Sequence, residues 1–333
     1  MSKEKFAAFY KKYGIFIILI FVIAFFSIFA QNFFSASNFI TILRQVSMLG
    51  IVVMAMSLIM ISGGMDLSVG GQIAVGGVLS ALEMASAHLP TPVVILLSLG
   101  FGLLCGFING WLSVSLNIAP MIVTLGTMLI LQSLALVITG GYPIYDINED
   151  IKVLGQGYIG FLPVPVLIFA VVVFVSWFLL KKTYLGHFTY AVGGNPEAAR
   201  LSGINVAKFR IFIFMLGGFF TSIASLIVMA RASSAQPNAG SNYAFDAITA
   251  AVLGGISIVG GEGTIEGSLI GVLIIGILNN GLLLMGIDSN WQGVIKGIVL
   301  IAAVGVDSIQ HIDKKVKISS EEIKEANADD TKH

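Results

Sequence analysis

The residues that could carry out catalytic chemistry are few in this sequence, and they are scattered. The four histidines lie far apart, at His88, His187, His311 and His333. The H-E-x-x-H spacing of zinc proteases, the G-x-S-x-G turn of serine hydrolases and the G-x-x-x-x-G-K-[ST] loop that holds ATP phosphates do not occur. The sequence therefore predicts no enzyme, no cofactor and no metal site. Without that loop the chain cannot hydrolyse ATP by this route, so the energy for any work must come from elsewhere.

One glycine-rich run invites comparison with a phosphate-binding loop. Gly260–Gly267 reads G-G-E-G-T-I-E-G, which does not match G-x-G-x-x-G. It joins two apolar segments instead of a strand and a helix, so the context of a nucleotide-binding fold is missing. The run predicts a tight turn.

Seven ionisable residues lie in or beside apolar segments, where charge is costly and often marks an ion pathway. They are Asp66, Glu83, Asp246, Glu262, Glu266, Lys296 and Asp307. All but Asp66 and Lys296 fall at segment ends. Asp66 is also suited to cap a helix, and Lys296 to pair or to reach the interface. Ion-coupled transport is therefore a weak alternative.

Neutral polar residues inside the apolar segments are more suggestive. They are Gln72, Asn109, Thr124, Thr127, Gln132, Asn279, Asn280 and Gln292. Such groups suit passing contact with a neutral, hydroxyl-rich solute, and they also serve as interhelical hydrogen bonds worth about 0.6 kcal/mol each. For any single residue the second role is favoured. As candidates for a translocation path we take Asp66, Asn109, Thr124, Thr127, Asn279 and Asn280.

Composition places the chain in a membrane. Of the 333 residues 56% are hydrophobic and 11% are charged, and mean hydropathy is +0.95, whereas soluble domains carry about 25% charged residues. The net charge is zero, and nothing in it indicates a nucleic-acid partner. The single cysteine, Cys105, can form no intrachain disulfide. We expect an all-α polytopic membrane protein in the cell membrane.

Ten apolar segments are candidates to cross the bilayer, which takes about 20 residues each. They are 14–31, 43–62, 66–86, 92–114, 119–139, 163–180, 209–230, 244–258, 265–285 and 289–307. Gly63-Gly64 predicts either a turn or a break within the membrane. The eighth segment is short enough to be a partial span. Glycines at small-xxx-small spacing, such as Gly102, Gly106 and Gly110, favour close helix packing within the chain.

Positive charge gives the expected orientation. With the N-terminus inside, fourteen of the eighteen lysines and arginines fall on the cytoplasmic side, and three (Arg44, Lys152, Arg231) lie outside or at the outer boundary. This bias requires an even number of spans, so both termini are predicted to be cytoplasmic. The predicted regions are a tail over 1–13, a transmembrane domain over 14–307 and a charged, disordered tail over 308–333.

A short water-facing helix is predicted at Gly193–Ile204, between the sixth and seventh spans. Asn195 suits the N-cap, Pro196 the first helical position, and Glu197 the positive end of the helix dipole. Gly203 then suits the left-handed position that ends the helix after about seven residues. Ala198, Ala199 and Leu201 would form a small apolar patch. A helix this short is unstable alone, so we expect it to be held by its flanks and to contact a partner.

Several segments together resemble the permease subunits of ribose-type ABC sugar importers. They are Ser62–Gly71 (S-G-G-M-D-L-S-V-G-G), Gly106–Leu112 (G-F-I-N-G-W-L), Ile118–Thr127 (I-A-P-M-I-V-T-L-G-T), Gly193–Ile204 and Ala247–Asp307. The ordered set covers nearly the whole of 14–307. Branched-chain amino-acid permeases share parts of these motifs, and G-G-M-D-L-S resembles the sugar branch.

The resemblance implies a type II-like ABC importer permease that works by alternating access. It implies as partners an ATPase with two nucleotide-binding modules, an extracytoplasmic sugar-binding protein and a second permease copy, most often identical. It further implies that 194–204 is a coupling helix that docks on the ATPase through Asn195, Pro196, Glu197, Ala198, Ala199, Arg200 and Gly203. The alternatives are a branched-chain amino-acid permease and, less favoured, an ion-coupled transporter. The sequence does not name the sugar.

Overall fold

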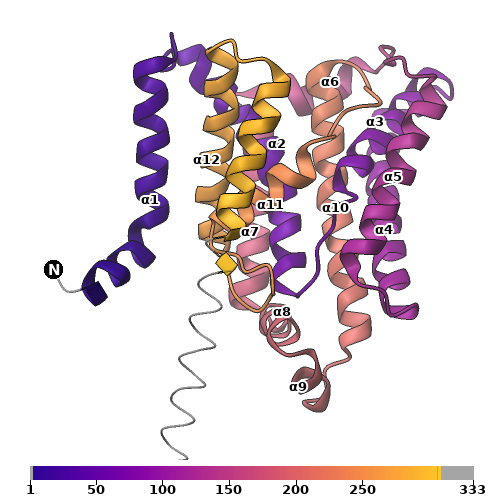
Figure 1. The fold of residues 1–333 in the computed structure, drawn as a ribbon. Helices are drawn as coiled ribbons and strands as arrows, with labels where there is room; N and C mark the ends of the chain where they lie inside the picture. Colours follow the sequence, from indigo (N-terminus) through magenta and orange to yellow (C-terminus); the bar gives the residue numbers. More distant parts are fainter. Residues whose placement is uncertain (1–2, 306, 309–333) are drawn as a thin grey trace, which may run out of the picture.

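The computed structural model describes residues 3–305, 307 and 308, and within them the chain is almost entirely helical (Figure 1). The predicted tail over 308–333 lies outside these residues, apart from position 308. The elements, in chain order, are α1 Lys3–Phe29, α2 Ala36–Ile61, α3 Val69–Ala85, α4 Thr91–Ser115, α5 Pro120–Thr139, α6 Glu149–Gln156, β1 Tyr158–Ile159, β2 Leu162–Pro163, α7 Val164–Lys182, α8 Tyr184–Gly194, α9 Pro196–Leu201, α10 Val206–Ala232, α11 Tyr243–Leu253 and α12 Ile265–Leu284. A last, unlabelled helix follows over 289–305.

The all-α fold class predicted from the sequence is confirmed. Among the described residues, six helices are long and apolar enough to cross a membrane: α2, α4, α5, α7, α10 and α12. Shorter apolar helices cover Gly14–Phe29, α3 and α11. The segment expected as a partial eighth span is α11, whose 11 residues extend about 16 Å, half of a ~30 Å bilayer core. Residues 3–13, expected as a tail, continue α1.

Local signals explain where many helices begin. Proline occupies the first turn of α4, α5 and α7, where its missing N–H is not needed. Ser35 caps α2 by accepting a hydrogen bond from the Asn38 N–H, and Thr264 caps α12 by accepting one from the Gly267 N–H. These caps satisfy N–H groups of the first turn, which have no partner within the helix.

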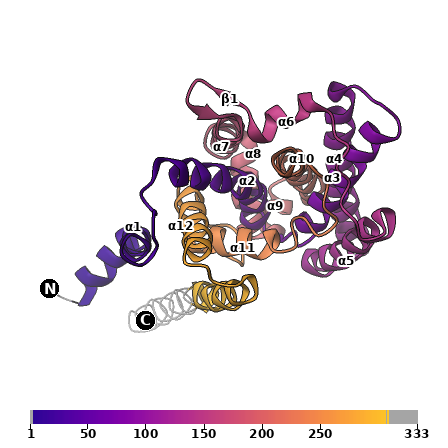
Figure 2. The ribbon, with the colours of Figure 1, turned by 90° about the horizontal axis from the view of Figure 1, so that it is seen from above.

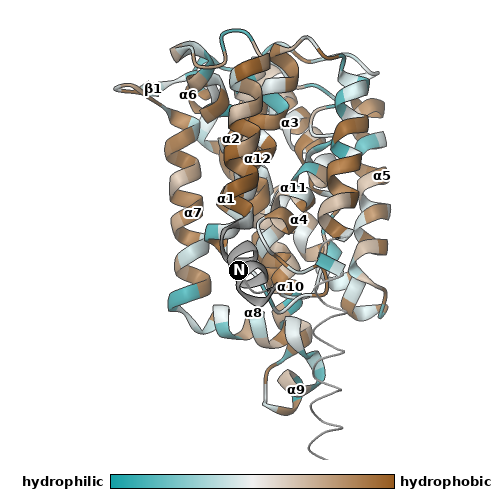
Figure 3. Cartoon of the chain, turned by 60° about the vertical axis from the view of Figure 1, so that its left-hand side comes forward, coloured by the Kyte–Doolittle hydropathy of each residue, from teal (hydrophilic) through white to brown (hydrophobic). Residues whose placement is uncertain are grey.

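Helix α2 is the centre of the bundle. All its residues from Val46 to Ile61 are buried, and it packs against α7, α10, α11 and α12 (Figure 2). By contrast, α4, α5 and α7 expose large apolar side chains along their lengths. Seen from the side, apolar residues cover the flanks of the bundle, whereas polar residues gather toward its two ends (Figure 3). This is the distribution expected for helices that face lipid.

Glycines allow α4 and α10 to touch along their backbones. A Cβ atom on Gly106 would lie 2.1 Å from the carbonyl oxygen of Phe214, and one on Gly102 would lie 2.2 Å from that of Gly218. Likewise, a Cβ atom on Gly271 of α12 would lie 1.9 Å from the carbonyl oxygen of Ala250 on α11. The expected close packing within the chain is therefore confirmed.

The two ends of the bundle differ. One end carries α6 and the β1–β2 hairpin, and we call it the α6 end; the other carries α8 and α9, and we call it the α9 end (Figure 1). The start of α1 and the end of the 289–305 helix both lie at the α9 end. At the α6 end, the short helix α6 lies against α10. There the Gln156 side chain donates to the carbonyls of Ala230 and Arg231, each at 3.1 Å, and so caps α10.

Candidate functional site: a projecting helix and polar clusters inside the bundle

The capped helix predicted at Gly193–Ile204 is confirmed in its local details. Helix α9 spans Pro196–Leu201, one residue shorter than expected. The Asn195 side chain accepts hydrogen bonds from the N–H groups of Glu197 and Ala198 at 3.1 and 3.0 Å, and Pro196 occupies the first turn. Gly203 has φ +88°, the left-handed conformation that ends the helix. The helix projects beyond the bundle (Figures 1 and 3).

The exposed face of α9 carries one ion pair and one large apolar side chain. The Arg200 guanidinium donates to both carboxylate oxygens of Glu197, at 2.5 and 3.1 Å. This pairing lowers the pKa of Glu197, so its carboxylate stays ionised at neutral pH. Leu201 is 79% exposed. Ala199, which the sequence placed in an apolar patch with Ala198 and Leu201, is 4% exposed and packs inward. The outward apolar surface is therefore formed by Ala198 and Leu201.

The base of α9 is joined to the bundle through glycine backbones, a contact that we call the glycine junction. It comprises Gly63 after α2, Gly193 in α8, and Gly260 and Gly261 before α12. A Cβ atom on Gly193 would lie 1.8 Å from the Ile61 carbonyl oxygen, and one on Gly260 would lie 2.8 Å from the Gly63 Cα. The Gly261 N–H donates to the Ile61 carbonyl at 2.8 Å. The run Gly260–Gly267 therefore begins with a packed turn, as predicted, with φ +99° and +74° at its first two residues.

Helix α8 was not expected from the sequence. It follows α7 directly and holds α9 through the Asn195 N–H, which donates to the Ala191 carbonyl at 3.0 Å. The Tyr190 hydroxyl donates to the Gly263 carbonyl at 2.8 Å and so fixes α8 to the segment before α12. Its eleven residues mix small, aromatic and polar types, so no apolar run or periodicity marked it as a separate helix.

Asp66 lies at the centre of a buried polar cluster. Its carboxylate accepts hydrogen bonds from the N–H and hydroxyl of Ser68, at 2.8 and 2.5 Å. Ser68 in turn accepts from the side-chain amides of Gln72 and Asn109, at 2.7 and 2.8 Å. The Thr124 hydroxyl of α5 donates to the carbonyl of Met65, the residue before Asp66, at 3.1 Å. Gly63 makes a turn with φ +82°, and the chain then runs without regular secondary structure to α3.

Lys296 and Asp246 form a second cluster. The Lys296 ammonium lies 3.0 Å from an Asp246 carboxylate oxygen, and their side chains are 18% and 11% exposed. Asn279 donates to the same oxygen at 3.2 Å. The pair joins the 289–305 helix to α11 and α12. Pairing was one of the roles expected for Lys296. Asp246 was not expected to be a deep ionisable residue, because it lies at the start of its apolar segment, but it is the residue that pairs with Lys296.

The remaining candidates lie apart from these two clusters. Asn280 exchanges two hydrogen bonds with Asn38 of α2, at 2.8 and 3.0 Å. Thr127 donates to the Val123 carbonyl of its own helix at 3.1 Å. The six candidates thus fall into two clusters, one amide pair and one isolated hydroxyl. Asn279 and Asn280 connect separate helices, and Asn109 and Thr124 connect their helices to the segment before α3. Interhelical hydrogen bonding is the role favoured for each residue alone. Within the described residues no three His, Cys, Asp or Glu side chains come together as a metal site.

Comparison with known proteins gives matches along most of the chain. A family model described as the permease component of branched-chain amino acid transport systems matches residues 38–304. The ribose import permease protein RbsC of Haemophilus influenzae is 43% identical over 297 residues, which cover 88% of this chain and 92% of that protein. RbsC of Bacillus subtilis is 47% identical over 201 residues, covering 60% and 62%. The galactose/methyl galactoside import permease protein MglC of Escherichia coli K12 is 38% identical over 240 residues, covering 70% and 71%. No solved structure matches the chain significantly.

The glycine junction can be tested with two neighbouring residues. We expect Gly193→Ala to destabilise the protein by about 1–3 kcal/mol, because the added methyl group overlaps the Ile61 carbonyl. Gly194→Ala is the matched control, since a Cβ there meets nothing within 4 Å. Thermal unfolding of the purified proteins in detergent measures the difference. Equal unfolding midpoints for the two variants would contradict the packing described.

The Lys296–Asp246 pair predicts a non-additive result. Lys296→Met leaves the Asp246 carboxylate buried without its cation and should cost about 3–5 kcal/mol. Adding Asp246→Asn should recover part of that loss, because no unpaired charge remains. Lys152→Met, which removes an exposed pair with Glu149, is the control and should change the unfolding midpoint little. If the loss of stability in the double variant equals the sum of the losses in the two single variants, the two groups do not interact.

Proposed function

This chain belongs to the family of permease components of branched-chain amino acid transport systems, and we propose that it is the permease subunit of an ATP-driven importer of small sugars. The observation that carries the proposal is the 43% identity to a ribose import permease over 88% of the chain. The chain is a multi-pass protein of the cell membrane and a transporter subunit, not an enzyme.

A neutral substrate fits the polar groups of the bundle better than an amino acid does. A zwitterion would need both a cation and an anion along its path. Lys296 and Asp246 already neutralise each other, and Asp66 accepts its hydrogen bonds from Ser68. Amides and hydroxyls dominate the other polar positions. Sugars are therefore the proposed substrate class, with branched-chain amino acids as the alternative.

The proposed topology has ten membrane segments, with the α9 end in the cytoplasm. The ten segments are the six long helices, α1, α3, α11 and the 289–305 helix. This orientation is supported by the fourteen-to-three distribution of positive charge. The proposed regions are a cytoplasmic N-terminal tail over 1–13, continuous with α1, the transmembrane domain over 14–307 and a cytoplasmic C-terminal tail over 308–333. The α6 end then faces the sugar-binding protein.

The proposed partner of α9 is an ABC ATPase with two nucleotide-binding modules. Residues 194–204 are the coupling segment, with Asn195, Pro196 and Gly203 fixing its shape and Glu197, Ala198, Arg200 and Leu201 offering its surface; Ala199 anchors it from within. Movement of the ATPase would pull α9, and the glycine junction would pass that movement to α2 and α12 as a rigid-body shift. Alternating access would follow as helices tilt against a second copy of the permease, proposed as identical.

The translocation path is proposed to run beside the Asp66 and Asp246 clusters. Asn109 and Thr124 belong to the first cluster and Asn279 to the second, whereas Thr127 and Asn280 lie on α5 and α12 near them in sequence. In this proposal the residues hold the walls of the path in position and offer spare hydrogen-bonding capacity to sugar hydroxyl groups.

Uptake by vesicles tests the function. We expect labelled ribose or galactose to accumulate only when the permease, the ATPase, the binding protein and ATP are all present. Labelled leucine, offered with the same components, should not accumulate. Uptake by this chain alone, driven by a proton or sodium gradient, would contradict the proposal and favour the ion-coupled alternative.

The coupling role of α9 is tested by exchanging its charges. Glu197→Arg combined with Arg200→Glu keeps an ion pair within the helix but inverts the charges offered to the ATPase. We expect the exchanged protein to remain folded, with at most a small loss of thermal stability because the charges now oppose the helix dipole, while ATP hydrolysis continues with little sugar uptake. Ala198→Trp should uncouple in the same way by steric obstruction. Normal uptake per ATP hydrolysed in both variants would rule out α9 as the coupling contact.

A further inference from the structure

The connection between α10 and α11, residues 233–242, is partly buried and runs from the α6 end toward the start of α3. Near the α6 end it is fixed by a β-bridge between Ile144 and Ala235, with hydrogen bonds of 2.8 and 2.9 Å. It then descends to the start of α3, where a Cβ atom on Gly70 would lie only 2.4 Å from the Gly240 carbonyl oxygen. The 17 residues of α3 extend about 25 Å from there to the α6 end. Gly240 is therefore buried against the start of α3, about 25 Å along that helix from the α6 end.

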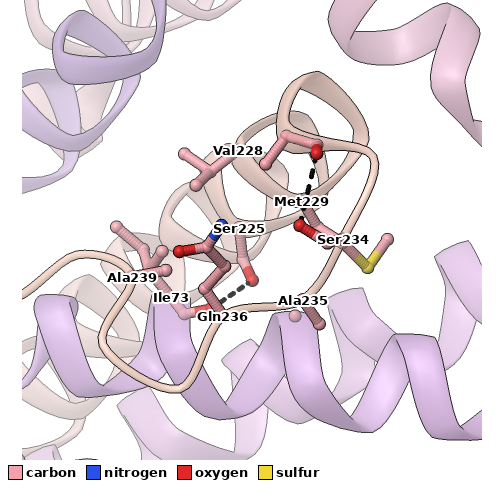
Figure 4. A pocket seen from close by; sticks show the side chains of 10 residues that line it. Ile73, Ser225, Val228, Met229, Ser234, Ala235, Gln236 and Ala239 are labelled. Carbon is pink, nitrogen blue, oxygen red and sulfur yellow. Dashed lines mark hydrogen bonds between the residues drawn. The ribbon is translucent and has the colours of Figure 1, made fainter. Parts of the chain in front are cut away.

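Irregular backbone at this depth needs an explanation, because its polar groups find no water in lipid. Such segments occur where they are buried in protein or line a water-filled cavity. Here a cavity of about 230 Å³ lies between the connection, α3 and α10 (Figure 4). Ile73 and Met229 form part of its buried wall, whereas Gln236 is exposed and marks its mouth.

The cavity lining is uncharged and combines apolar walls with a few hydrogen-bonding groups. The Ser225 hydroxyl donates to the Ile73 carbonyl at 2.8 Å, and the Ser234 hydroxyl donates to the Ala232 carbonyl at 3.2 Å. Both oxygens keep lone pairs that can accept. The Gln236 side-chain amide has no hydrogen-bond partner among the residues that the structure describes, so its two donors and its acceptor are available. Figure 4 shows it beside Ser225 and Val228.

We propose that this cavity is a transient binding site for one neutral monosaccharide on the outer side of the permease, and this rests on the proposed function as a sugar importer. Its volume is that of about eight water molecules at ~30 Å³ each, enough for a single small solute. The apolar walls suit the C–H face of a sugar ring, and Gln236 offers both a donor and an acceptor to hydroxyl groups. An amino acid would bury two charges here without partners. The few polar contacts predict weak, millimolar binding, as a passing site requires.

Protection of an introduced thiol tests the site directly. In the assembled permease and ATPase, reconstituted in lipid without the binding protein, Gln236→Cys should react with a water-soluble maleimide. Millimolar ribose or galactose should slow that reaction several-fold, and leucine should not. Asn238→Cys, on the same connection but outside the cavity lining, is the matched control and should show no protection. The native Cys105 is buried, so the parent protein gives the background.

Uptake supplies the second measurement. With binding protein in excess, Gln236→Leu should lower the rate of sugar uptake about tenfold, and Asn238→Leu should leave it unchanged. If the parent protein imports sugar but sugar protects neither thiol, the site is wrong and the proposed function stands. If leucine protects the thiol at position 236 and is imported while sugar is not, both the site and the proposed function are wrong.

Discussion

The structure depends on a point at its α9 end where three stretches of backbone meet without side chains between them. Gly193 of α8 lies against the carbonyl of Ile61 at the end of α2, and Gly260 lies against Gly63. Helix α9 has six residues and cannot build a core of its own. Its position is therefore set by this junction. Because backbone atoms in contact cannot yield as flexible side chains do, a displacement of α8 and α9 must move the end of α2 and the turn before α12.

The same principle of close backbone contact organises the membrane-spanning part. Glycines on α4 and α12 let these helices meet α10 and α11 directly, which leaves α2 enclosed at the centre. Polar contacts then fix the helices relative to one another. The Asn38–Asn280 pair joins α2 to α12, and the Lys296–Asp246 pair joins the last helix to α11. Because these groups pair within the protein, none of them needs a partner from the lipid.

Two short helices, α3 and α11, begin inside the bundle instead of at its ends. Each is preceded by irregular chain that packs against the bundle. Before α3, the Asp66 carboxylate accepts from the buried Ser68 N–H; before α11, the connection from α10 covers a cavity with uncharged walls. Interrupted helices of this kind can line a cavity and offer backbone hydrogen-bonding groups in the middle of a membrane protein, whereas continuous helices pack closely along their whole length.

Much of the local structure of this protein can be predicted from signals that lie within a few residues of one another. The apolar segments, the Asn195 cap and the left-handed Gly203 could be predicted because each depends on composition or on neighbours in the chain. The tertiary structure decided which distant groups meet. Asn38 and Asn280 are 242 residues apart, and no spacing in the sequence connects Asp246 with Lys296 or Gly193 with Ile61. It also turned Ala199 inward, formed α8 and created the cavity beneath residues 233–242. These features arise from helices packing against one another, and a contact of that kind depends on three-dimensional positions that local sequence does not specify.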